Sequence, residues 1–404
     1  MSLFNNRFRL LCLGLTLSTS GYLSLAPAFN GLARHSFSGS KTMTHTHADR
    51  ARASNNRRQS LFINKRGEIA IDVSKYQGVR SFSEGLAAVW LPDDNWGFID
   101  KTGSMVIPPR YQEVLSFSEG LAAVQIKGLW GFINREGHLV IPPQYEVANS
   151  FHEGIAVVRK SRVVEAPAPP GKSPLGFIQV KTLRTSQTTR SDLMIRTEIT
   201  PNMDVLLIDM NGQTVLSKNT NDIQFEVEGH PRFSDGLILV WNPKIKKYGY
   251  IDRTGKVAIE PKYSNAAPFS EGLARIAVFQ GGDEKLGFIS RNGQFVIPPR
   301  FNTDGNFARN STDFSEGLAA LTEDLNPTLT EKGRFAYIDK QGNVVLLTEF
   351  SAAGPFREGL AEVFDENSGK WGYIDKSGKL VIPTLYEFAD PFSEGLALVV
   401  KMER

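Results

Sequence analysis

An acidic residue stands before glycine in a six-residue phrase that occurs eight times in this chain. The phrase reads Phe-Ser-Glu-Gly-Leu-Ala at residues 117–122 and is slightly altered in the other copies. Eight carboxylates at one repeated position would bind cations or a basic partner if they converged. We favour the alternative that each carboxylate accepts backbone N–H groups in its own turn and recurs because the turn recurs. The eight acids are Glu84, Glu119, Glu153, Asp235, Glu271, Glu316, Glu358 and Glu394.

Residue types that commonly perform catalysis are sparse. The single cysteine, Cys12, lies in an apolar run near the N-terminus, and only His138, His152 and His230 lie among the repeats. No metalloprotease motif, phosphate-binding loop or dinucleotide fingerprint is present. We therefore expect no catalytic residue, no metal site and no cofactor. A hydrolase is the remaining enzymatic alternative, and it would need two carboxylates about 5 to 10 Å apart in a cleft, at least one of them with a raised pKa.

The elements that must position these acids come from an internal repeat. Two neighbouring units show it most cleanly, and they begin at Trp96 and at Trp130, 34 residues apart. Each unit continues as Gly-Phe-Ile-Asp/Asn, a turn glycine, Val-Ile-Pro-Pro, a tyrosine and the acidic phrase. A fixed period of this length is typical of repeat architectures. The 404 residues therefore predict one repeat domain rather than several globular ones.

Each segment of the unit has a local structural interpretation. Phe-Ile-Asp and Val-Ile are short β-branched and aromatic runs that favour strands, and the Asp/Asn-Lys/Arg-x-Gly between them favours a tight hairpin turn. Asp100, Asn134, Asp252, Asp339 and Asp375 occupy the turn position that suits an Asx residue. The prolines end the second strand, and Ser-Glu-Gly is a second turn before a third strand. Each unit is thus predicted to be a β meander of at least three strands, with the repeated aromatic side chains between units.

The fourth unit is irregular. Its opening, Leu175-Gly176-Phe177-Ile178, is interrupted, and a second candidate, Leu207-Ile208-Asp209, precedes the phrase at Phe233. We interpret Lys181 to Asp204 as an insertion in the first hairpin of this unit, approached by a proline-rich stretch, so that the insertion spans about 166–204. Its basic side chains make it a candidate partner-binding loop. They are Lys181, Arg184, Arg190 and Arg196.

The repeated residues resemble the WG-repeat (KWG repeat) family of bacterial proteins. The shared signature is Trp-Gly-[Phe/Tyr]-Ile-Asp, Val-Ile-Pro-Pro-x-Tyr and Phe-Ser-Glu-Gly-Leu-Ala, and the likeness covers about residues 61–400. Departures are local: Leu175, Tyr248, Leu286 and Phe335 replace the tryptophan, and Ala336 replaces the glycine. The resemblance implies an all-β repeat scaffold and implies little about a reaction.

A unit this small cannot bury both faces of its own sheet, so neighbouring units must stack. Eight meanders can do this as a closed, propeller-like ring or as an open β-superhelix. The first unit lacks a strand before Leu61, whereas the chain finishes on the strand 396–400. Because the last strand could complete the first unit and remove both free edges, we predict the ring.

The first residues predict export. Arg7 and Arg9 precede an apolar run, and Ala26-Pro27-Ala28 places small residues at a cleavage site, so residues 1–28 are interpreted as a signal peptide. The run is short for a membrane span, which needs roughly 20 residues, so no stable membrane insertion is expected after cleavage. Residues 29–59 are polar and predict a disordered tether, in which His45 and His47 are interpreted as solvated rather than metal-binding. The repeat domain then spans 60–404.

Composition narrows the choice of partners. The net charge of +3 is small, and much of the excess base lies in the N-terminal tail, so no nucleic-acid-binding face is predicted. We expect a periplasmic or cell-surface scaffold that binds a protein partner through its loops. The alternative is a peptidoglycan- or polysaccharide-binding module, which would expose aromatic side chains on one face.

Overall fold

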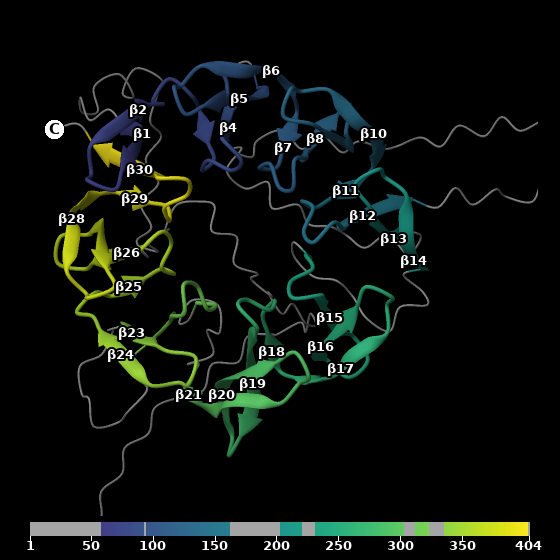
Figure 1. Ribbon diagram of the computed structural model, residues 1–404, viewed down its shortest axis with the longest axis vertical. Helices are drawn as coiled ribbons and strands as arrows, with labels where there is room; N and C mark the ends of the chain where they lie inside the picture. Colours follow the sequence, from purple (N-terminus) through teal and green to yellow (C-terminus); the bar gives the residue numbers. More distant parts are fainter. Residues whose placement is uncertain are drawn as a thin grey trace, which may run out of the picture.

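A computed structural model describes residues 58–92, 94–161, 203–219, 231–302, 312–322 and 335–402. Within these residues every regular element is a β-strand, and the strands form eight small antiparallel sheets. Figure 1 shows the sheets arranged around a central axis, like the blades of a propeller. The predicted closed ring of eight meanders is therefore confirmed, and the open superhelix is not adopted.

The blades are numbered here in chain order, and their strands are given from the axis outward. Blade 1 contains β29 (Phe388–Ala389), β30 (Leu396–Met402), β1 (Arg58–Asn64) and β2 (Ile69–Asp72), and blade 2 contains β3 (Gly78–Val79), β4 (Leu86–Trp90), β5 (Trp96–Asp100) and β6 (Met105–Tyr111). Blade 3 contains β7 (Glu113–Val114), β8 (Ala122–Ile126), β9 (Leu129–Ile133) and β10 (Leu139–Tyr145), and blade 4 contains β11 (Val147–Ala148), β12 (Ala156–Ser161), β13 (Met203–Ile208) and β14 (Thr214–Asn219).

Blades 5 to 8 follow the same plan, although the described residues of blades 5 and 7 form three strands each. Blade 5 contains β15 (Leu237–Asn242), β16 (Lys247–Asp252) and β17 (Val257–Tyr263), and blade 6 contains β18 (Asn265–Ala266), β19 (Leu273–Gln280), β20 (Asp283–Ser290) and β21 (Phe295–Asn302). Blade 7 contains β22 (Ala319–Thr322), β23 (Phe335–Ile338) and β24 (Val344–Leu347), and blade 8 contains β25 (Ala352–Ala353), β26 (Leu360–Asp365), β27 (Lys370–Asp375) and β28 (Leu380–Tyr386).

Blade 1 closes the ring by combining strands from the two ends of the described chain. Strand β1 pairs with β30 over seven residues, from Arg58 opposite Met402 to Asn64 opposite Leu396. This pairing covers the edges that β1 and β30 would otherwise expose.

The glycine of Trp-Gly is required by the outermost strand. In blade 3 a Cβ atom at Gly131 would lie 2.5 Å from the carbonyl oxygen of Ile141 and 2.7 Å from the nitrogen of Pro143. The Ile-Pro-Pro segment bulges over this glycine, and the register shifts there. In blade 7 the outer strand has no proline and does not shift at this position, so Ala336 is accommodated. The replacement of glycine by alanine thus has a structural cause.

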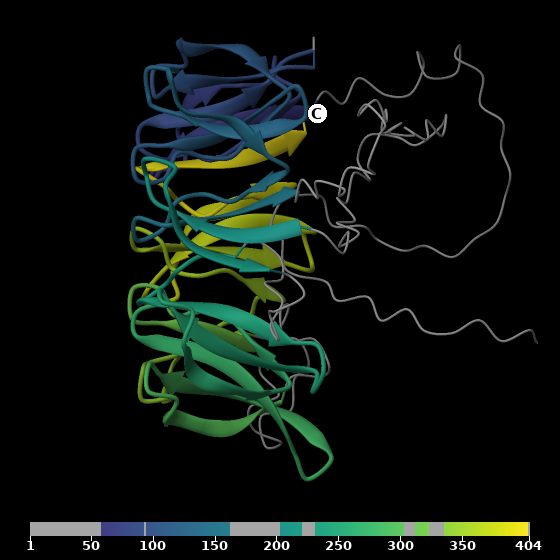
Figure 2. The same ribbon diagram turned by 90° about the vertical axis from the view of Figure 1, so that its right-hand side faces the viewer.

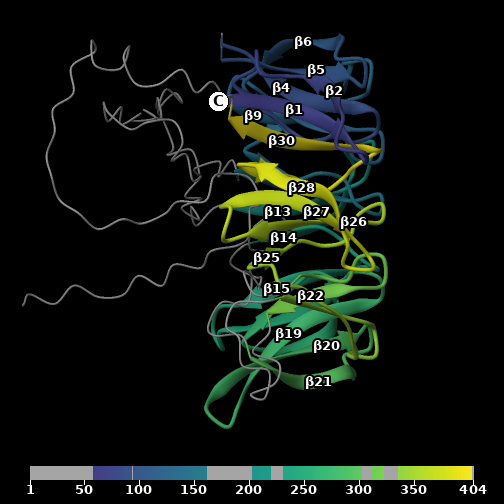
Figure 3. The ribbon, with the colours of Figure 1, turned by 90° about the vertical axis from the view of Figure 1, so that its left-hand side faces the viewer.

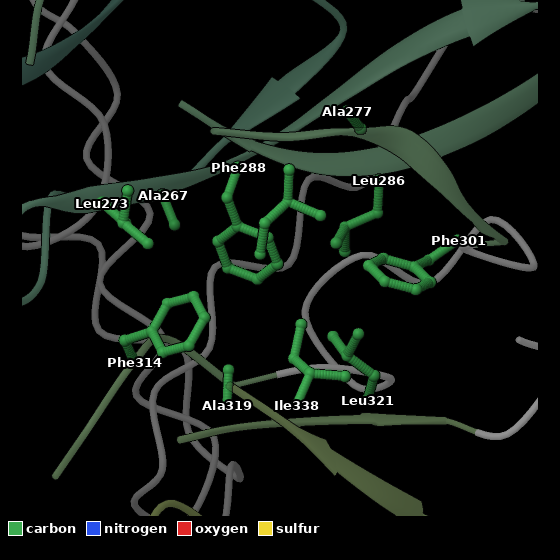
Figure 4. Close-up of a cluster of buried hydrophobic side chains, with 11 residues drawn as sticks. Ala267, Leu273, Ala277, Leu286, Phe288, Phe301, Phe314, Ala319, Leu321 and Ile338 are labelled. Atoms are coloured by element: carbon green, nitrogen blue, oxygen red, sulfur yellow. The ribbon is translucent and has the colours of Figure 1, made fainter. Parts of the chain in front are cut away.

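The core lies mainly between blades. The phenylalanine of each acidic phrase packs against the third strand of the preceding blade, as Phe117 does against Phe98, with ring centroids 5.0 Å apart. Figure 4 shows the equivalent contact between Phe288 of blade 6 and Phe314 of blade 7, whose centroids are 4.9 Å apart. Because these rings are buried, the expectation that repeated aromatic side chains fill the spaces between units is met for the phenylalanines, whereas Trp96 and Trp371 are half-buried.

The antiparallel strands give the disk two different faces, seen side-on in Figure 2. One, which we call the turn face, carries the acidic phrase between the first and second strands and the Asp-x-x-Gly turn between the third and fourth. The other, the loop face, carries the connections between the second and third strands and those from one blade to the next. Segments 162–202, 220–230, 303–311 and 323–334 lie outside the described residues.

Candidate functional site

The acidic phrase forms a two-residue turn that requires an unusual backbone. Glu271 has φ of 53° and Gly272 has φ of 87°, and the other seven copies have the same pair of positive angles. Two consecutive positive φ values match the right-handed twist of the flanking strands. The conformation suits glycine and asparagine but costs about 1 kcal/mol for glutamate. Some other contact must therefore favour an acid at this position.

That contact is made with the next blade. The carboxylate of Glu84 in blade 2 accepts the N–H of Gly120 in blade 3 at 2.9 Å, and Glu394 of blade 1 accepts the N–H of Gly85 in blade 2 at 2.9 Å. The same contact occurs at all eight junctions and forms a continuous ring. Our expectation that each acid serves its own turn is wrong in this respect. A glutamate at left-handed φ directs its carboxylate across the gap to the next turn.

Cations of the Asp-Lys-x-Gly turns reinforce most of these junctions. Lys376 Nζ lies 3.0 Å from a carboxylate oxygen of Glu316 and also donates to the backbone oxygen of that residue. Burial opposes ionisation of Glu316, but Lys376 and the backbone N–H groups of blade 8 outweigh it and hold the pKa below its ordinary value. In blade 4, Met210 occupies the lysine position. Equivalent ion pairs involve Lys65, Lys101, Arg253 and Lys340.

The serine of the phrase provides a second link between blades. Ser83 donates its hydroxyl to the carbonyl of Phe117 at 2.7 Å, and five other copies do the same. His152 and Arg357 occupy this position in the remaining two copies. Since the acids, serines and cations of the turn face bind the ring itself, this face does not present a free ring of carboxylates to a ligand.

The Asx turns were predicted correctly. The side chain of Asp100 accepts the N–H groups of Thr102 and Ser104 at 2.9 and 3.0 Å, and Asn134 accepts the N–H of His138 at 2.8 Å. These side chains shape the hairpins between the third and fourth strands.

Two carboxyl groups with raised pKa values bear on the hydrolase alternative. Burial raises the pKa of Glu362 to about 8, and the neighbouring Asp390 carboxyl contributes to this increase. Burial also raises the pKa of Asp390, whose carboxyl accepts a hydrogen bond from the Ser81 hydroxyl at 2.7 Å. Glu362 is only 3% exposed and packs over Gly354, where a Cβ atom would lie 1.8 Å from its oxygen. A carboxyl enclosed in this way is not accessible to a substrate, so the pair does not form an active site.

The loop face is less regular, and it carries several exposed or half-exposed aromatic and basic side chains. Trp90 and Trp96 stack across one hairpin with centroids 6.1 Å apart, and both are half-buried. Phe279, at the end of the β19–β20 hairpin, is 67% exposed. Sequence reasoning missed Phe279 and the lysine-rich β15–β16 turn, although both depart from the repeat and could have been found for that reason.

The predicted partner-binding residues of the insertion cannot be placed. Lys181, Arg184, Arg190 and Arg196 lie outside the described residues, as do the signal peptide, the tether, His45 and His47. The sheet does show where the insertion enters the fold. Strand β13, which contains Leu207, pairs directly with β12, so the interruption precedes the third strand of blade 4 rather than lying within the following hairpin.

Two further observations concern the described residues alone. They contain no group of three or more His, Cys, Asp or Glu side chains arranged to hold a metal ion. They also contain no helix long and apolar enough to cross a membrane.

The fold and its two faces define an eight-bladed β-propeller built from one repeated unit, and comparison with known proteins places it in a family. The profile of the WG containing repeat family matches residues 62–89, 96–130, 130–161, 248–278, 287–324, 335–367 and 371–401, more than half of the chain. The chain therefore belongs to this family, and the resemblance seen in the sequence is confirmed. The irregular fourth unit lies between the third and fourth matches.

The chain is also distantly similar to solved structures. No curated protein matches the sequence. Among solved structures, BamB from Moraxella catarrhalis is 10% identical, with 83% of this chain and 88% of that chain covered and a TM-score of 0.41. A chain of the Mitotic Checkpoint Complex is 10% identical (76% and 91% covered, TM-score 0.37). KlHsv2 with loop 6CD replaced by a Gly-Ser linker is 8% identical (81% and 97% covered, TM-score 0.36).

Proposed function

We propose that this propeller is a non-catalytic scaffold that binds a protein partner through its loop face. The observation that carries the proposal is the difference between the two faces. The turn-face side chains bond to the next blade, whereas the exposed Ile245 and Phe279 belong to the loop face. Rigid scaffolds commonly bind through loops that vary without disturbing the core.

The proposed location is the cell envelope, and this part rests on the N-terminal sequence. Residues 1–28 have the pattern of an export signal, and residues 29–59 would tether the propeller. An exported chain without a second cysteine must be stabilised by packing, and the interlocked blades would meet that requirement.

Photo-cross-linking tests which face binds. A photoreactive residue is placed at Leu129 on the loop face or at Glu136 on the turn face; both are exposed and belong to blade 3. The full chain is then irradiated in envelope extract, and adducts are identified by mass spectrometry. We expect a discrete protein adduct from Leu129 and none from Glu136. Equal adducts from both positions, or no discrete adduct from loop-face positions, would contradict the proposal.

The insertion is tested by deleting it without breaking the sheet. Ser161 and Met203 are directly paired, so an Asn-Gly turn can join β12 to β13 in place of residues 162–202. Loss of the adduct in this variant would assign the contact to the insertion and to its basic residues. Retention would assign it to the blades.

Polysaccharide or peptidoglycan binding is the second candidate, because aromatic pairs lie on the loop face. Trp241 contacts Tyr248 at 4.6 Å and Phe364 contacts Trp371 at 5.3 Å between ring centroids, in addition to the Trp90–Trp96 pair. Sedimentation of the full chain with purified peptidoglycan, reduced by Trp90→Ala, would favour this function. Sedimentation unaffected by Trp90→Ala would count against the aromatic pair as the site.

A further inference from the structure

Two neighbouring hairpins on the loop face present apolar side chains to solvent. In blade 5 the turn between β15 and β16 carries Ile245, which is 54% exposed, and in blade 6 the β19–β20 hairpin carries Phe279, which is 67% exposed. Strands β19 and β20 are eight residues long, and Figures 1 and 3 show their hairpin projecting beyond the ring. An exposed aromatic residue on a projecting hairpin is a common anchor in protein interfaces.

Both hairpins are held in a defined shape. The buried side chain of Asn242 accepts the N–H groups of Lys244 at 3.0 Å and of Ile245 at 3.3 Å, which fixes the turn that presents Ile245. The β19–β20 hairpin closes through Gly281 and Gly282, both at positive φ, with Gln280 opposite Asp283. Preorganised turns lose little conformational entropy on binding, so they can anchor a partner at low cost.

The surroundings of these apolar side chains are rich in lysine. Lys244, Lys246 and Lys247 lie within four residues, and Lys247 Nζ is 5.9 Å from the centre of the Phe279 ring, which links the two hairpins. Among the described residues, no carboxylate lies within 4.0 Å of the ammonium group of Lys244 or Lys246. We call Ile245, Phe279 and these three lysines the lysine-apolar patch.

Carboxylates border the patch on the side of blade 6. Asp283 lies 3.7 Å from Lys285, and Glu284 accepts the hydroxyl of Ser264 at 2.6 Å. A uniformly anionic lipid surface would meet these carboxylates with repulsion as it approached Phe279. A polypeptide can place acidic residues over the lysines and neutral residues over the carboxylates, so the charge pattern favours a peptide over a membrane.

From this arrangement we infer that the lysine-apolar patch binds an acidic segment of a partner protein through a bulky apolar side chain that packs on Phe279 and Ile245. The inference rests on the proposed scaffold function and specifies the chemistry of the partner. The lysines would attract and orient the acidic segment, and the two apolar side chains would hold it.

Fluorescence anisotropy with a defined probe tests this directly. The probe is a labelled peptide of Asp, Glu and Gly with one central Leu, and the comparison peptide carries Ser in place of that Leu. We expect the full chain to bind the Leu peptide about tenfold more tightly than the Ser peptide, with an affinity that falls as salt is raised. Phe279→Ser should weaken binding about tenfold, and Lys244→Glu several-fold.

Two variants serve as matched controls. Phe295→Ser removes a phenylalanine that is 49% exposed on the outer strand of the same blade, and Lys379→Glu reverses an exposed charge on the turn face of blade 8. Neither should change the affinity for the Leu peptide by more than about twofold. Effects as large as those of Phe279→Ser and Lys244→Glu would overturn the inference, and so would equal binding of the two peptides.

The same variants separate this inference from the scaffold proposal. Vesicles of anionic phospholipid that bind in a Phe279-dependent manner, while the peptides do not bind, would identify a membrane-binding patch and overturn the inference. In the cross-linking experiment, a partner still captured by the Phe279→Ser, Lys244→Glu double variant would refute this patch but leave the scaffold function intact. Failure of the wild-type chain to cross-link to any discrete protein would refute the scaffold function itself.

Discussion

Replacing Glu271 with alanine should measure what one carboxylate contributes to the ring. One oxygen of Glu271 accepts the N–H of Glu316 at 2.6 Å, and the other accepts the N–H of Gly317 at 3.0 Å. Lys340 Nζ lies 3.2 Å from the second oxygen. The substitution removes all three contacts, and they join blade 6 to blade 7.

The expected loss follows from these contacts. Each backbone N–H bond to the partly exposed carboxylate contributes about 1 kcal/mol net, and the half-exposed ion pair with Lys340 contributes about 0.5 kcal/mol at most. Glu271→Ala should therefore reduce the free energy of unfolding by about 2 to 2.5 kcal/mol. Glu271→Gly loses the same contacts but relieves the left-handed backbone at φ 53°, which is worth about 1 kcal/mol. The glycine variant should thus be the more stable of the two.

Urea unfolding of the full chain, followed by tryptophan fluorescence and circular dichroism, measures both differences. Glu366→Ala is the control, because Glu366 is an exposed glutamate on the loop face. It should change the free energy of unfolding by less than about 0.5 kcal/mol. A loss under about 0.5 kcal/mol for Glu271→Ala, or a glycine variant less stable than the alanine variant, would refute this account of the turn.

Three further substitutions test other features of the fold. Glu362→Gln should reduce the pH dependence of stability. Burial raises the pKa of Glu362 to about 8, whereas an unfolded glutamate titrates near about 4.3. The folded protein therefore holds an extra proton on Glu362 between these values, and this group lowers stability by up to about 1.4 kcal/mol per pH unit as pH rises. Urea midpoints at pH 5 and pH 8 should differ less in the variant than in the wild type, where Asp390 contributes as well. An equal difference in the two proteins would show that Glu362 does not titrate in this range. Phe117→Ala removes a side chain that is 1% exposed and should cost about 3 to 5 kcal/mol in urea unfolding; a cost under about 1 kcal/mol would contradict its role between blades. Gly131→Ala places a Cβ atom 2.5 Å from the Ile141 oxygen and should lower the thermal midpoint by several degrees, whereas Ala336→Gly in blade 7 should change it little. Equal shifts for these last two variants would contradict the explanation of the Trp-Gly motif.

Much of the fold was predictable because the unit repeats. Eight copies of the same strand and turn signals reveal a meander even where one copy, such as the fourth, is degraded. The innermost strands were not predicted, because pairs such as Glu113–Val114 are too short to show a period. Their pairing is visible only in space, where they lie against the second strand of their blade.

The acidic phrase shows a different limit. Its recurrence identified Glu119 as important, and the turn chemistry correctly indicated backbone N–H partners. The sequence could not show that the partners are Glu153 and Gly154 of the next blade, because a contact across 34 or 35 residues leaves no local pattern. Likewise, Glu362 stands where other second strands have Ala88, Ala123 and Ala320, but its enclosure over Gly354 depends on cross-strand pairing.

The exceptions within the ring indicate which contact the fold depends on most. Arg357 replaces serine in blade 8, yet Glu358 in the same turn still accepts the N–H of Gly395 at 3.0 Å. Met210 removes the cation opposite Glu119, yet Glu119 still accepts the N–H of Gly154 at 2.7 Å. The serine and the cation are therefore dispensable at individual junctions, whereas the carboxylate–glycine contact is present at all eight. Because each acidic turn bonds to the turn of the next blade, a substitution on the turn face affects two blades at once. The hairpins on the loop face are not part of this ring of contacts, so one of them can lengthen, as β19–β20 does, without disturbing the ring.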